Sequence, residues 1–486
     1  MNAFALHLQT PRGRGHTPPA GFTGAAGGAA CGDLIRISVA LRDGVSVTDA
    51  GFDASGCGAT IAAGSAAVSL VRGAPLLEAA RVGVDAIAAE LGGLMPGKRH
   101  AAELAADALH RALGQAARLR GQLEPRGDRV LVAMSGGVDS SVAALVSARE
   151  GDEVAAVTLE LWSDPDNDGE QSCCSAQAVR RARTLAHDMG LPHLTLDLRD
   201  EFRAGVVEPW LADHGAGLTP NPCVRCNGEV RLDAMLDLAD RLGAGSLATG
   251  HYARVAREAD AGGDGAETPL LRAAVDPAKD QSYMLAALAP DSLARMRFPL
   301  GRLRKDEVRE IAAQAGLPTA RAPESQDLCF LAGTGRAAFL ARHGGLGERR
   351  GEIVDRAGRA LGHHRGHHGF TVGQRRGLGV GGGEALYVLA TEARANTVTV
   401  GTREDLRTER VTVRELVLHR GASRVDRVKL RYRSRPLACK VAGDLGPGRH
   451  PRASLELEEA VYGAAPGQLA CLMDGDVVIG HATIAR

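Results

Sequence analysis

The sequence predicts a multidomain protein with an N-terminal α+β domain, a doubly wound α/β domain, a small β-rich central domain and a C-terminal β-barrel. Its 486 residues are enough for about three domains of ordinary size. From residue 128 the chain reads as strand, Gly-rich turn, helix and strand, the pattern of a parallel βαβ unit. Beyond about residue 345, short strand-like segments between glycine turns replace the helical pattern. We expect the domains at 1–120, 126–344, 345–407 and 408–486.

The first domain begins with a Gly- and Ala-rich stretch, followed by the strand-like segment DLIRISVAL (33–41) and a turn at RDG. A Gly-rich segment, GCGATIAAGS (56–65), then leads into helical periodicity. The stretch GQLEPRGD (121–128) has the composition of a linker. The last predicted helix of the domain, AAELAADALHRALGQAARL (101–119), carries one apolar face at Leu104, Ala108, Leu109, Ala112 and Leu113.

The second domain begins with the strand-like RVLVAM (129–134), the helix-like SSVAALVSARE (140–150) and the strand-like EVAAVTLEL (153–161). A strand, a helix and a second strand so close together favour a parallel doubly wound sheet. Further along, ALYVLA, NTVTVG, RVTVREL and VVIGHATI each read as a short strand. They favour β-rich structure that ends in a barrel.

The composition is that of a globular protein, with 24% charged and 44% hydrophobic residues. No run of about 18 apolar residues is present, so the sequence predicts no membrane span. The first residues lack a long apolar segment with a small-residue cleavage site, so we expect a cytoplasmic protein. Nine cysteines spread over so long a chain do not form the pattern of a secreted disulfide framework.

The net charge of the whole chain is +0, but the charges are unevenly distributed. Residues 341–486 contain 24 Lys and Arg against 16 Asp and Glu, a net charge of +8, and the first 340 residues carry −8. The C-terminal third is therefore a candidate RNA-binding surface. On charge alone, a solvated surface without a partner is an equally good interpretation.

The most specific motif is MSGGVDSSV (134–142), at the end of the first strand of the βαβ unit. Its glycines allow close approach of the backbone to a ligand, and the loop amides and the following helix would bind a phosphate. The Walker pattern G-x-x-x-x-G-K-[ST] is absent. A plain helix-capping turn would require no particular order of residues. The order S-G-G-x-D-S resembles the PP-loop of ATP pyrophosphatases, which cleave ATP between its α and β phosphates and adenylate a carbonyl.

Further motifs narrow this resemblance. Together with TPNPCVRCN (219–227), they resemble the tRNA-specific 2-thiouridylases (MnmA) over residues 128–486. That resemblance implies a transferase that modifies the wobble uridine of tRNA: ATP adenylates the C2 oxygen and sulfur then replaces it. The additional motifs are ATGHYARV (248–255), DPAKDQSYML (276–285), PESQDLCFL (323–331), GFTVGQRRGLGVGGG (369–383), LRYRSRP (430–436) and APGQLACL (465–472).

The resemblance also implies an ATP site in which Asp139 suits a Mg²⁺ contact and Gly250 lies on the adenine side. Loop amides and the metal would stabilise the charge that develops during adenylation. The residues that would line this site are Ala133, Met134, Ser135, Gly136, Gly137, Val138, Asp139, Ser140, Leu159 and Gly250.

Three cysteines carry the expected sulfur chemistry. By the family pattern Cys226 is the nucleophile and Cys329 receives a persulfide. The attacking form is the thiolate, and Arg225 or a helix N-terminus would favour it by lowering the pKa of the thiol. Cys223 stands where some family members have an aspartate. Alternatively, Cys223, Cys226 and Cys329 hold three irons of a [4Fe–4S] cluster whose fourth iron carries sulfide. An inert core role is the third interpretation, and the sequence favours it least.

The family pattern also assigns contacts with tRNA. The wobble base must leave its stack to be reached, and Asn221, Pro222 and Cys223 would face it. Lys279 and Arg431 suit phosphates, which position RNA without reading its sequence. The remaining expected tRNA contacts are His251, Asp280, Gln281, Tyr432 and Gln468.

The first 118 residues are similar to the iron–sulfur scaffold proteins IscU/NifU, through TPRGRG (10–15), ACGD (30–33), GCGATIAAGS (56–65) and GKRHAAELAADAL (97–109). The scaffold ligands that remain are Cys31, Asp33, Cys57 and His100, which could form a tetrahedral Zn²⁺ site. Ala101 stands where the family has a further cysteine, which puts cluster assembly in doubt.

Two roles for this fusion remain open. It would raise the effective concentration of a sulfur or cluster donor near Cys329, for which a cysteine desulfurase or sulfur-relay protein would dock on it. Otherwise it is a structural remnant. Two alternatives to thiolation also remain: another PP-loop enzyme related to argininosuccinate synthase or GMP synthetase, and a non-enzymatic carrier of clusters or tRNA.

Overall fold

The described residues form two compact units. No helix in the described part of the chain has the length and apolar character that crossing a membrane requires. The computed structural model describes residues 2–27, 32–163, 175–259, 267–322, 328–331, 333–380 and 384–486. The first unit comprises Met1–Arg199, Asp233–His251 and Arg295–Phe330, and the second comprises Asp200–Leu232, Tyr252–Ala294 and Leu331–Arg486.

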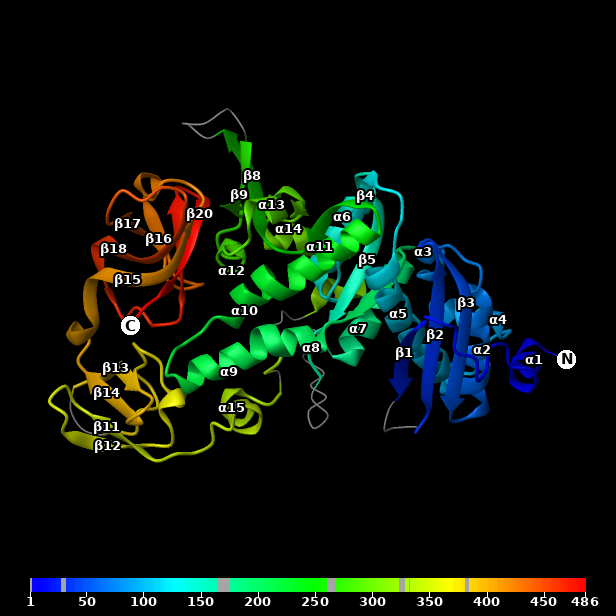
Figure 1. Ribbon diagram of the computed structural model, residues 1–486, viewed down its shortest axis with the longest axis horizontal. Coiled ribbons are helices and arrows are strands. Elements are labelled where there is room, and N and C mark those ends of the chain that lie inside the picture. The colour runs from blue at the N-terminus through cyan, green and yellow to red at the C-terminus, as the bar shows by residue number, and fades with distance from the viewer. Residues whose placement is uncertain are drawn as a thin grey trace. The chain divides into compact units, whose positions relative to one another are not determined.

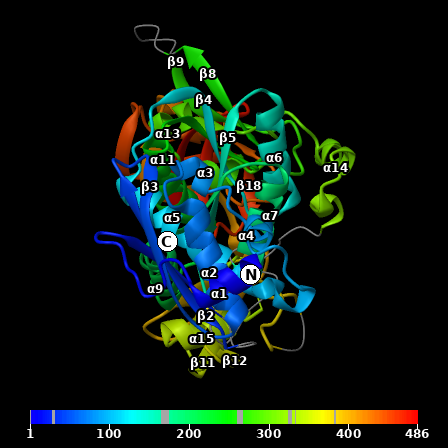
Figure 2. The ribbon, with the colours of Figure 1, turned by 90° about the vertical axis from the view of Figure 1, so that its right-hand side faces the viewer.

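The N-terminal domain is an antiparallel sheet in the order β1-β2-β3, with helices packed against it (Figure 1 and Figure 2). Burial along the strands alternates, because one face of the sheet packs on helices α2 and α5. Its elements are α1 (Ala3–Gln9), β1 (Phe22–Gly27), β2 (Leu34–Arg42), β3 (Ser46–Ser55), α2 (Gly58–Val71), α3 (Leu76–Ala79), α4 (Val84–Glu90), η1 (Pro96–Lys98) and α5 (Arg99–Arg120).

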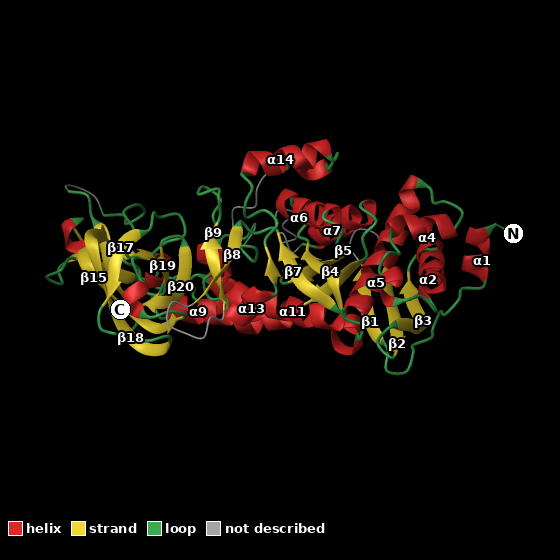
Figure 3. Cartoon of the chain, turned by 90° about the horizontal axis from the view of Figure 1, so that it is seen from above, coloured by secondary structure: helices red, strands yellow, loops and turns green. Residues whose placement is uncertain are grey.

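The α/β domain contains a parallel sheet in the order β10-β7-β4-β5-β6. Figure 3 shows helices α6 and α7 over one face of its strands. Strand β5 is buried almost throughout, as expected for a parallel sheet. The elements are β4 (Arg126–Ala133), α6 (Val138–Arg149), β5 (Glu153–Glu160), α7 (Ala176–Asp188), β6 (His193–Asp197), α8 (Arg199–Phe202), α11 (Leu232–Arg241), β7 (Ala244–Thr249), β10 (Met296–Arg297), α14 (Lys305–Gln314) and η4 (Pro318–Arg321).

The second unit includes short helices, the hairpin β8–β9 and a four-stranded sheet in the order β12-β11-β14-β13. The sheet has its own apolar core around Ile353, Val388 and Val398. The elements are η2 (Arg203–Val207), α9 (Glu208–Gly215), α10 (Pro222–Arg225), η3 (Cys226–Arg231), β8 (Ala253–Ala259), β9 (Glu267–Ala273), α12 (Ser282–Leu285), α13 (Pro290–Ala294), α15 (Arg336–Gly344), β11 (Gly351–Val354), β12 (Ala360–His364), η5 (His367–Gly369), β13 (Tyr387–Glu392), β14 (Thr397–Gly401) and η6 (Glu404–Leu406).

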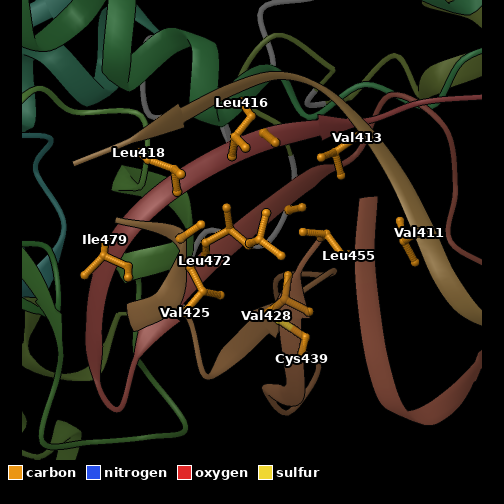
Figure 4. Close-up of a cluster of buried hydrophobic side chains, with 14 of the residues drawn as sticks. Val411, Val413, Leu416, Leu418, Val425, Val428, Cys439, Leu455, Leu472 and Ile479 are labelled. Carbon is orange, nitrogen blue, oxygen red and sulfur yellow. The ribbon is translucent and has the colours of Figure 1, made fainter. Parts of the chain in front are cut away.

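The C-terminal strands form a barrel, because β15 pairs with both β18 and β20 and so closes the sheet. Figure 4 shows its core, where Val413, Leu416, Leu455 and Leu472 meet. The predicted fold class, from α+β through α/β to β-barrel, is confirmed. The barrel elements are β15 (Arg407–Leu418), η7 (Ala422–Arg424), β16 (Arg427–Lys429), β17 (Leu437–Val441), β18 (Gly448–Tyr462), β19 (Leu469–Asp474) and β20 (Val477–Ile484).

Candidate active site

The predicted ATP loop lies between the end of β4 and the start of α6, at the carboxyl edge of the parallel sheet. The hydroxyl of Ser140 fixes its shape: it accepts a hydrogen bond from the Ser135 amide at 3.1 Å and donates one to the Gly137 carbonyl at 3.1 Å. Gly136 has a φ of +74°, which favours glycine. The loop and the N-terminus of α6 therefore form a cradle suited to an anion.

Gly250 closes this cradle from the end of β7. A Cβ atom at Gly250 would lie 2.7 Å from the backbone nitrogen of Ser140, so a side chain would collide with the first turn of α6. His251 follows, and its Nδ1 lies 2.8 Å from the hydroxyl of Thr249. Leu159 is buried near the carboxyl end of β5, the strand next to β4.

Lys305, which the sequence motifs did not indicate, extends into the same loop. Its Nζ atom donates to both carboxylate oxygens of Asp139, at 2.6 and 2.8 Å. The lysine is the first residue of α14, where the helix dipole disfavours a cation, and its side chain is only 12% exposed. The structure thus places a largely buried cation beside the proposed phosphate cradle, at a position that helix formation alone does not favour.

The segment with the two nearby cysteines forms α10 and the π-helix η3. Asn221 caps α10 by accepting a hydrogen bond from the Cys223 amide at 3.2 Å, and Pro222 occupies the first turn. Cys226 is buried at the start of η3, and Cys223 is half-buried. π-Helical turns within helices frequently occur at functional sites. Arg225, expected to lower a thiol pKa, lies 3.9 Å from Glu229.

The structure brings several expected tRNA contacts together within the second unit. Gln468 donates from Nε2 to the Thr219 carbonyl at 2.6 Å, which ties the 466–469 turn to the start of the cysteine segment. Asn221 contacts Met284 through Nδ2 and Sδ at 3.6 Å. The ring of Tyr432 lies 6.3 Å from that of Tyr283.

Three other expected contacts take part in hydrogen bonds that stabilise the fold. Asp280 accepts hydrogen bonds from Ser282 and lies 3.3 Å from Lys429 Nζ. Gln281 exchanges hydrogen bonds with the backbone of Tyr252, at 2.9 and 2.8 Å. Arg431 donates to the Gly463 carbonyl at 2.6 Å.

Cys329 lies in the first unit, two positions after residues 323–327, which are outside the described part of the chain. It is half-buried. Two other cysteines, Cys439 and Cys471, are core residues of the barrel. Burial raises the pKa of each thiol to about 12, so both stay protonated and unreactive.

Three of the four expected metal ligands of the N-terminal domain meet. Asp33, Cys57 and His100 place one ligand atom each within 4.8 Å of the others, and Cys31 lies outside the described residues. His100 Nδ1 faces the Gly97 carbonyl at 3.1 Å, which leaves Nε2 directed at Asp33 at 3.5 Å. A backbone carbonyl that fixes the tautomer in this way is typical of histidine metal ligands.

Thr60 supports this group and was not indicated by the sequence. Its hydroxyl donates to Asp33 Oδ2 at 2.6 Å, and the Cys57 amide donates to Oδ1 at 3.0 Å. The hydrogen bond from Thr60 is the main reason that the pKa of Asp33 lies below its ordinary value. The carboxylate is therefore ionised and ready to bind a cation.

Comparisons with known proteins match every part of this architecture. Family models match residues 3–121 as a NifU-like N terminal domain, 128–333 as a tRNA methyl transferase HUP domain, 337–402 as a tRNA methyl transferase PRC-barrel domain and 409–484 as an aminomethyltransferase beta-barrel domain. The bifunctional protein NifU/MnmA of Rubrobacter xylanophilus is 42% identical, over 99% of this chain and 97% of that protein.

The chain belongs to the bifunctional NifU/MnmA family. Two tRNA-specific 2-thiouridylases MnmA are also similar to this chain. The protein from Geobacter metallireducens is 41% identical over 72% of this chain and 95% of its own length, and that from Thermobifida fusca is 42% identical over 74% and 96%. The resemblances that the motifs indicated are thus confirmed for both parts, and these NifU/MnmA relatives do not favour a different PP-loop enzyme.

Proposed function

We propose that this NifU/MnmA protein uses ATP to replace the C2 oxygen of the wobble uridine of tRNA with sulfur. The observation that carries the proposal is the 42% identity to a bifunctional NifU/MnmA protein over 99% of the chain. The ATP loop and the cysteine segment lie within residues 128–333, which match a tRNA methyl transferase HUP domain. Since the substrates would be ATP and tRNA, we expect the protein to act in the cytoplasm.

We propose that the loop from Ser135 to Ser140 and the N-terminus of α6 bind the phosphates of ATP. Asp139 is the proposed contact for Mg²⁺, which would neutralise phosphate charge. Lys305, already hydrogen-bonded to Asp139, supplies a second positive charge to the departing pyrophosphate. The uridine C2 oxygen attacks the α-phosphorus, pyrophosphate leaves, and AMP becomes the leaving group on C2.

The proposed sulfur transfer uses Cys329 and Cys226. A donor first converts the Cys329 thiol into a persulfide. The outer sulfur attacks uridine C2 and expels AMP, and the Cys226 thiolate then attacks the Cys329 sulfur. This step releases 2-thiouridine and leaves a Cys226–Cys329 disulfide, which a thiol reductant reopens. In the other route that the residues allow, Cys226 releases sulfide from the persulfide before sulfide attacks C2.

We propose that the tRNA is bound by the second unit. Its residues after 341 belong to the part of the sequence with a net charge of +8. The cluster around Asn221, Tyr432 and Gln468 would face the flipped base, with Lys279 and Arg431 on phosphates. A cysteine desulfurase or sulfur-relay protein is the proposed donor.

The N-terminal group fits a metal ion by its donor set, because a thiol, an imidazole nitrogen of fixed tautomer and an ionised carboxylate converge there. Zn²⁺ accepts these ligand types, and Cys31 would complete a tetrahedral set. A bound ion would stabilise the domain and would favour the thiolate form of Cys57.

The decisive experiment measures AMP and 2-thiouridine formed from ATP, tRNA and inorganic sulfide by anaerobically purified protein. With sulfide we expect tRNA-dependent AMP formation, and the control Cys57→Ser should be fully active. With a cysteine desulfurase as the sulfur source, thiolation should occur in the wild type and be lost in Cys226→Ser. Iron that depends on Cys223, with activity that follows iron content, would instead indicate the cluster mechanism. Absence of tRNA-dependent AMP would contradict the proposed function.

A further inference from the structure

Within the first unit, helix α5 of the NifU-like domain forms ion pairs with the ATP-binding domain through one cation and one anion. Arg111 of α5 donates from Nε to both carboxylate oxygens of Glu160, at 3.1 and 2.9 Å, and from Nη2 at 2.6 Å. Asp107 of α5 accepts from Arg180 and Arg183, each at 2.7 Å. Glu160 and Arg183 are almost fully buried, so removal of one partner would leave an uncompensated charge.

The same helix covers the edge of the parallel sheet. Strand β6 is last in the sheet order, so the backbone groups on its outer side have no neighbouring strand of this sheet to pair with. The NifU-like domain pairs two of them: the His193 amide donates to the Ala80 carbonyl at 3.0 Å, and the His193 carbonyl lies 2.8 Å from His110 Nδ1. A Cβ atom at Gly114 would lie 1.9 Å from the Thr195 carbonyl oxygen, so helix and strand meet backbone to backbone.

A hydrogen-bond path leads from this edge to the ATP loop. Thr158 of β5 donates to the carbonyl of Met134, the first residue of the loop motif, at 2.9 Å. Because its single proton is used there, the Thr158 hydroxyl accepts from His193 Nε2 at 2.8 Å. Glu160, which Arg111 binds, directly follows Leu159 of the proposed ATP site.

Backbone hydrogen bonds tie the connection between the two domains to both of them. The Gln122 amide donates to the Gly44 carbonyl at 3.1 Å, and the Leu123 amide donates to the Arg241 carbonyl at 3.0 Å. Strand β4 begins at Arg126. The stretch predicted as a linker is thus bound to both domains.

We propose that the NifU-like domain is a fixed support of the ATP site, in which Arg111 and His110 are positioning residues that hold the end of β5 and the start of the loop. This inference rests on the proposed function for the identity of the nucleotide. It also implies that a sulfur donor must come to a docked domain, rather than the domain carrying sulfur on a flexible tether.

The test uses the full chain and inorganic sulfide, so that no donor protein is needed. In Arg111→Met we expect the KM for ATP and the Kd for a non-hydrolysable ATP analogue to rise by about 3-fold to 30-fold, with the KM values for tRNA and sulfide unchanged. Arg111→Lys, which keeps the charge but not the two-pronged contact, should give a smaller rise. The control is Arg99→Met, on the same helix in the exposed pair with Asp85, which should match the wild type.

The outcomes separate this inference from the proposed function. A folded Arg111→Met or Arg111→Lys protein with wild-type affinity for the ATP analogue would overturn the inference. If Arg111→Met does not fold, the Arg111→Lys measurement decides. Wild-type protein that binds the analogue but forms no AMP with tRNA would contradict the proposed function, and the effect of Arg111 on analogue binding would still decide the inference.

Discussion

The ATP loop and the group formed by Asp33, Cys57 and His100 are both held by hydrogen bonds, but their surroundings differ. The loop is supported by buried groups from β5 and β7 and, through His193, by helix α5. The metal group lies closer to solvent: Cys57 is half-buried and the His100 side chain is 37% exposed. A residue in tight surroundings cannot adjust when its neighbour changes, so substitutions should disturb the loop far more than the metal group.

The largest expected effect comes from Gly250→Val. The new side chain would displace the first turn of α6, and a misplacement of this size should lower ATP-dependent AMP formation by about 100-fold or more. Steady-state kinetics with tRNA and sulfide would measure it. Gly127→Ala is the matched control, because its Cβ would meet no atom within 4 Å. Near-normal activity in Gly250→Val would show that the loop is not tightly supported.

A smaller loss is expected for Lys305→Met. Loss of one charge-assisted contact with phosphate should raise the KM for ATP by roughly tenfold, with little change in the KM for tRNA. Arg302→Met, an exposed cation nearby, serves as the control. An unchanged KM for ATP in the lysine variant would remove Lys305 from the proposed site.

The residues changed in these two variants differ in how far the sequence could predict them. The loop at 135–140 and the meeting of Asp33, Cys57 and His100 could be anticipated because these residues lie in motifs that resemble known families, and alternation of short strands indicated the barrel. Lys305 lies 166 residues from Asp139, and Arg111 lies 49 residues from Glu160. A lone lysine at the start of a helix has no distinguishing pattern. Such pairs follow from how the helices pack, which the periodicity of one sequence does not specify.

Acid should weaken the support of the loop. Burial lowers the pKa of His187 to about 4 and the pKa values of His110 and His193 well below 6.5. The unfolded chain binds these protons near pH 6.5 but the folded chain does not, so stability is complete above pH 6.5 and falls as the pH drops towards 4.

Urea unfolding of the full chain at pH 7 and pH 5 would measure this dependence. We expect His187 to contribute a loss of roughly 2 kcal/mol between pH 7 and pH 5, and His110 and His193 to add to the loss in the same direction. In His187→Gln the loss should be smaller by about that amount. An identical pH dependence of stability in wild type and His187→Gln would contradict the role of His187 in the loss of stability at low pH.

The smallest effect on ATP chemistry is expected for His100→Ala. Metal content after anaerobic purification should fall, while sulfide-driven AMP formation should stay within about twofold of wild type, because the group lies outside the path to the loop. His16→Ala, in the exposed pair with Asp49 of the same domain, should retain the metal. If metal content and AMP formation fell together in His100→Ala, the group at His100 would not be independent of the ATP loop.

The covered edge of β6 also bears on how the chain folds during synthesis. Domains generally fold in the order in which they leave the ribosome, so residues 1–120 can be folded before β6 emerges. Helix α5 and Ala80 then present a finished surface on which the new strand docks. An uncovered sheet edge can pair wrongly with other chains. We therefore expect the folded NifU-like domain to protect the ATP-binding domain from such association during synthesis.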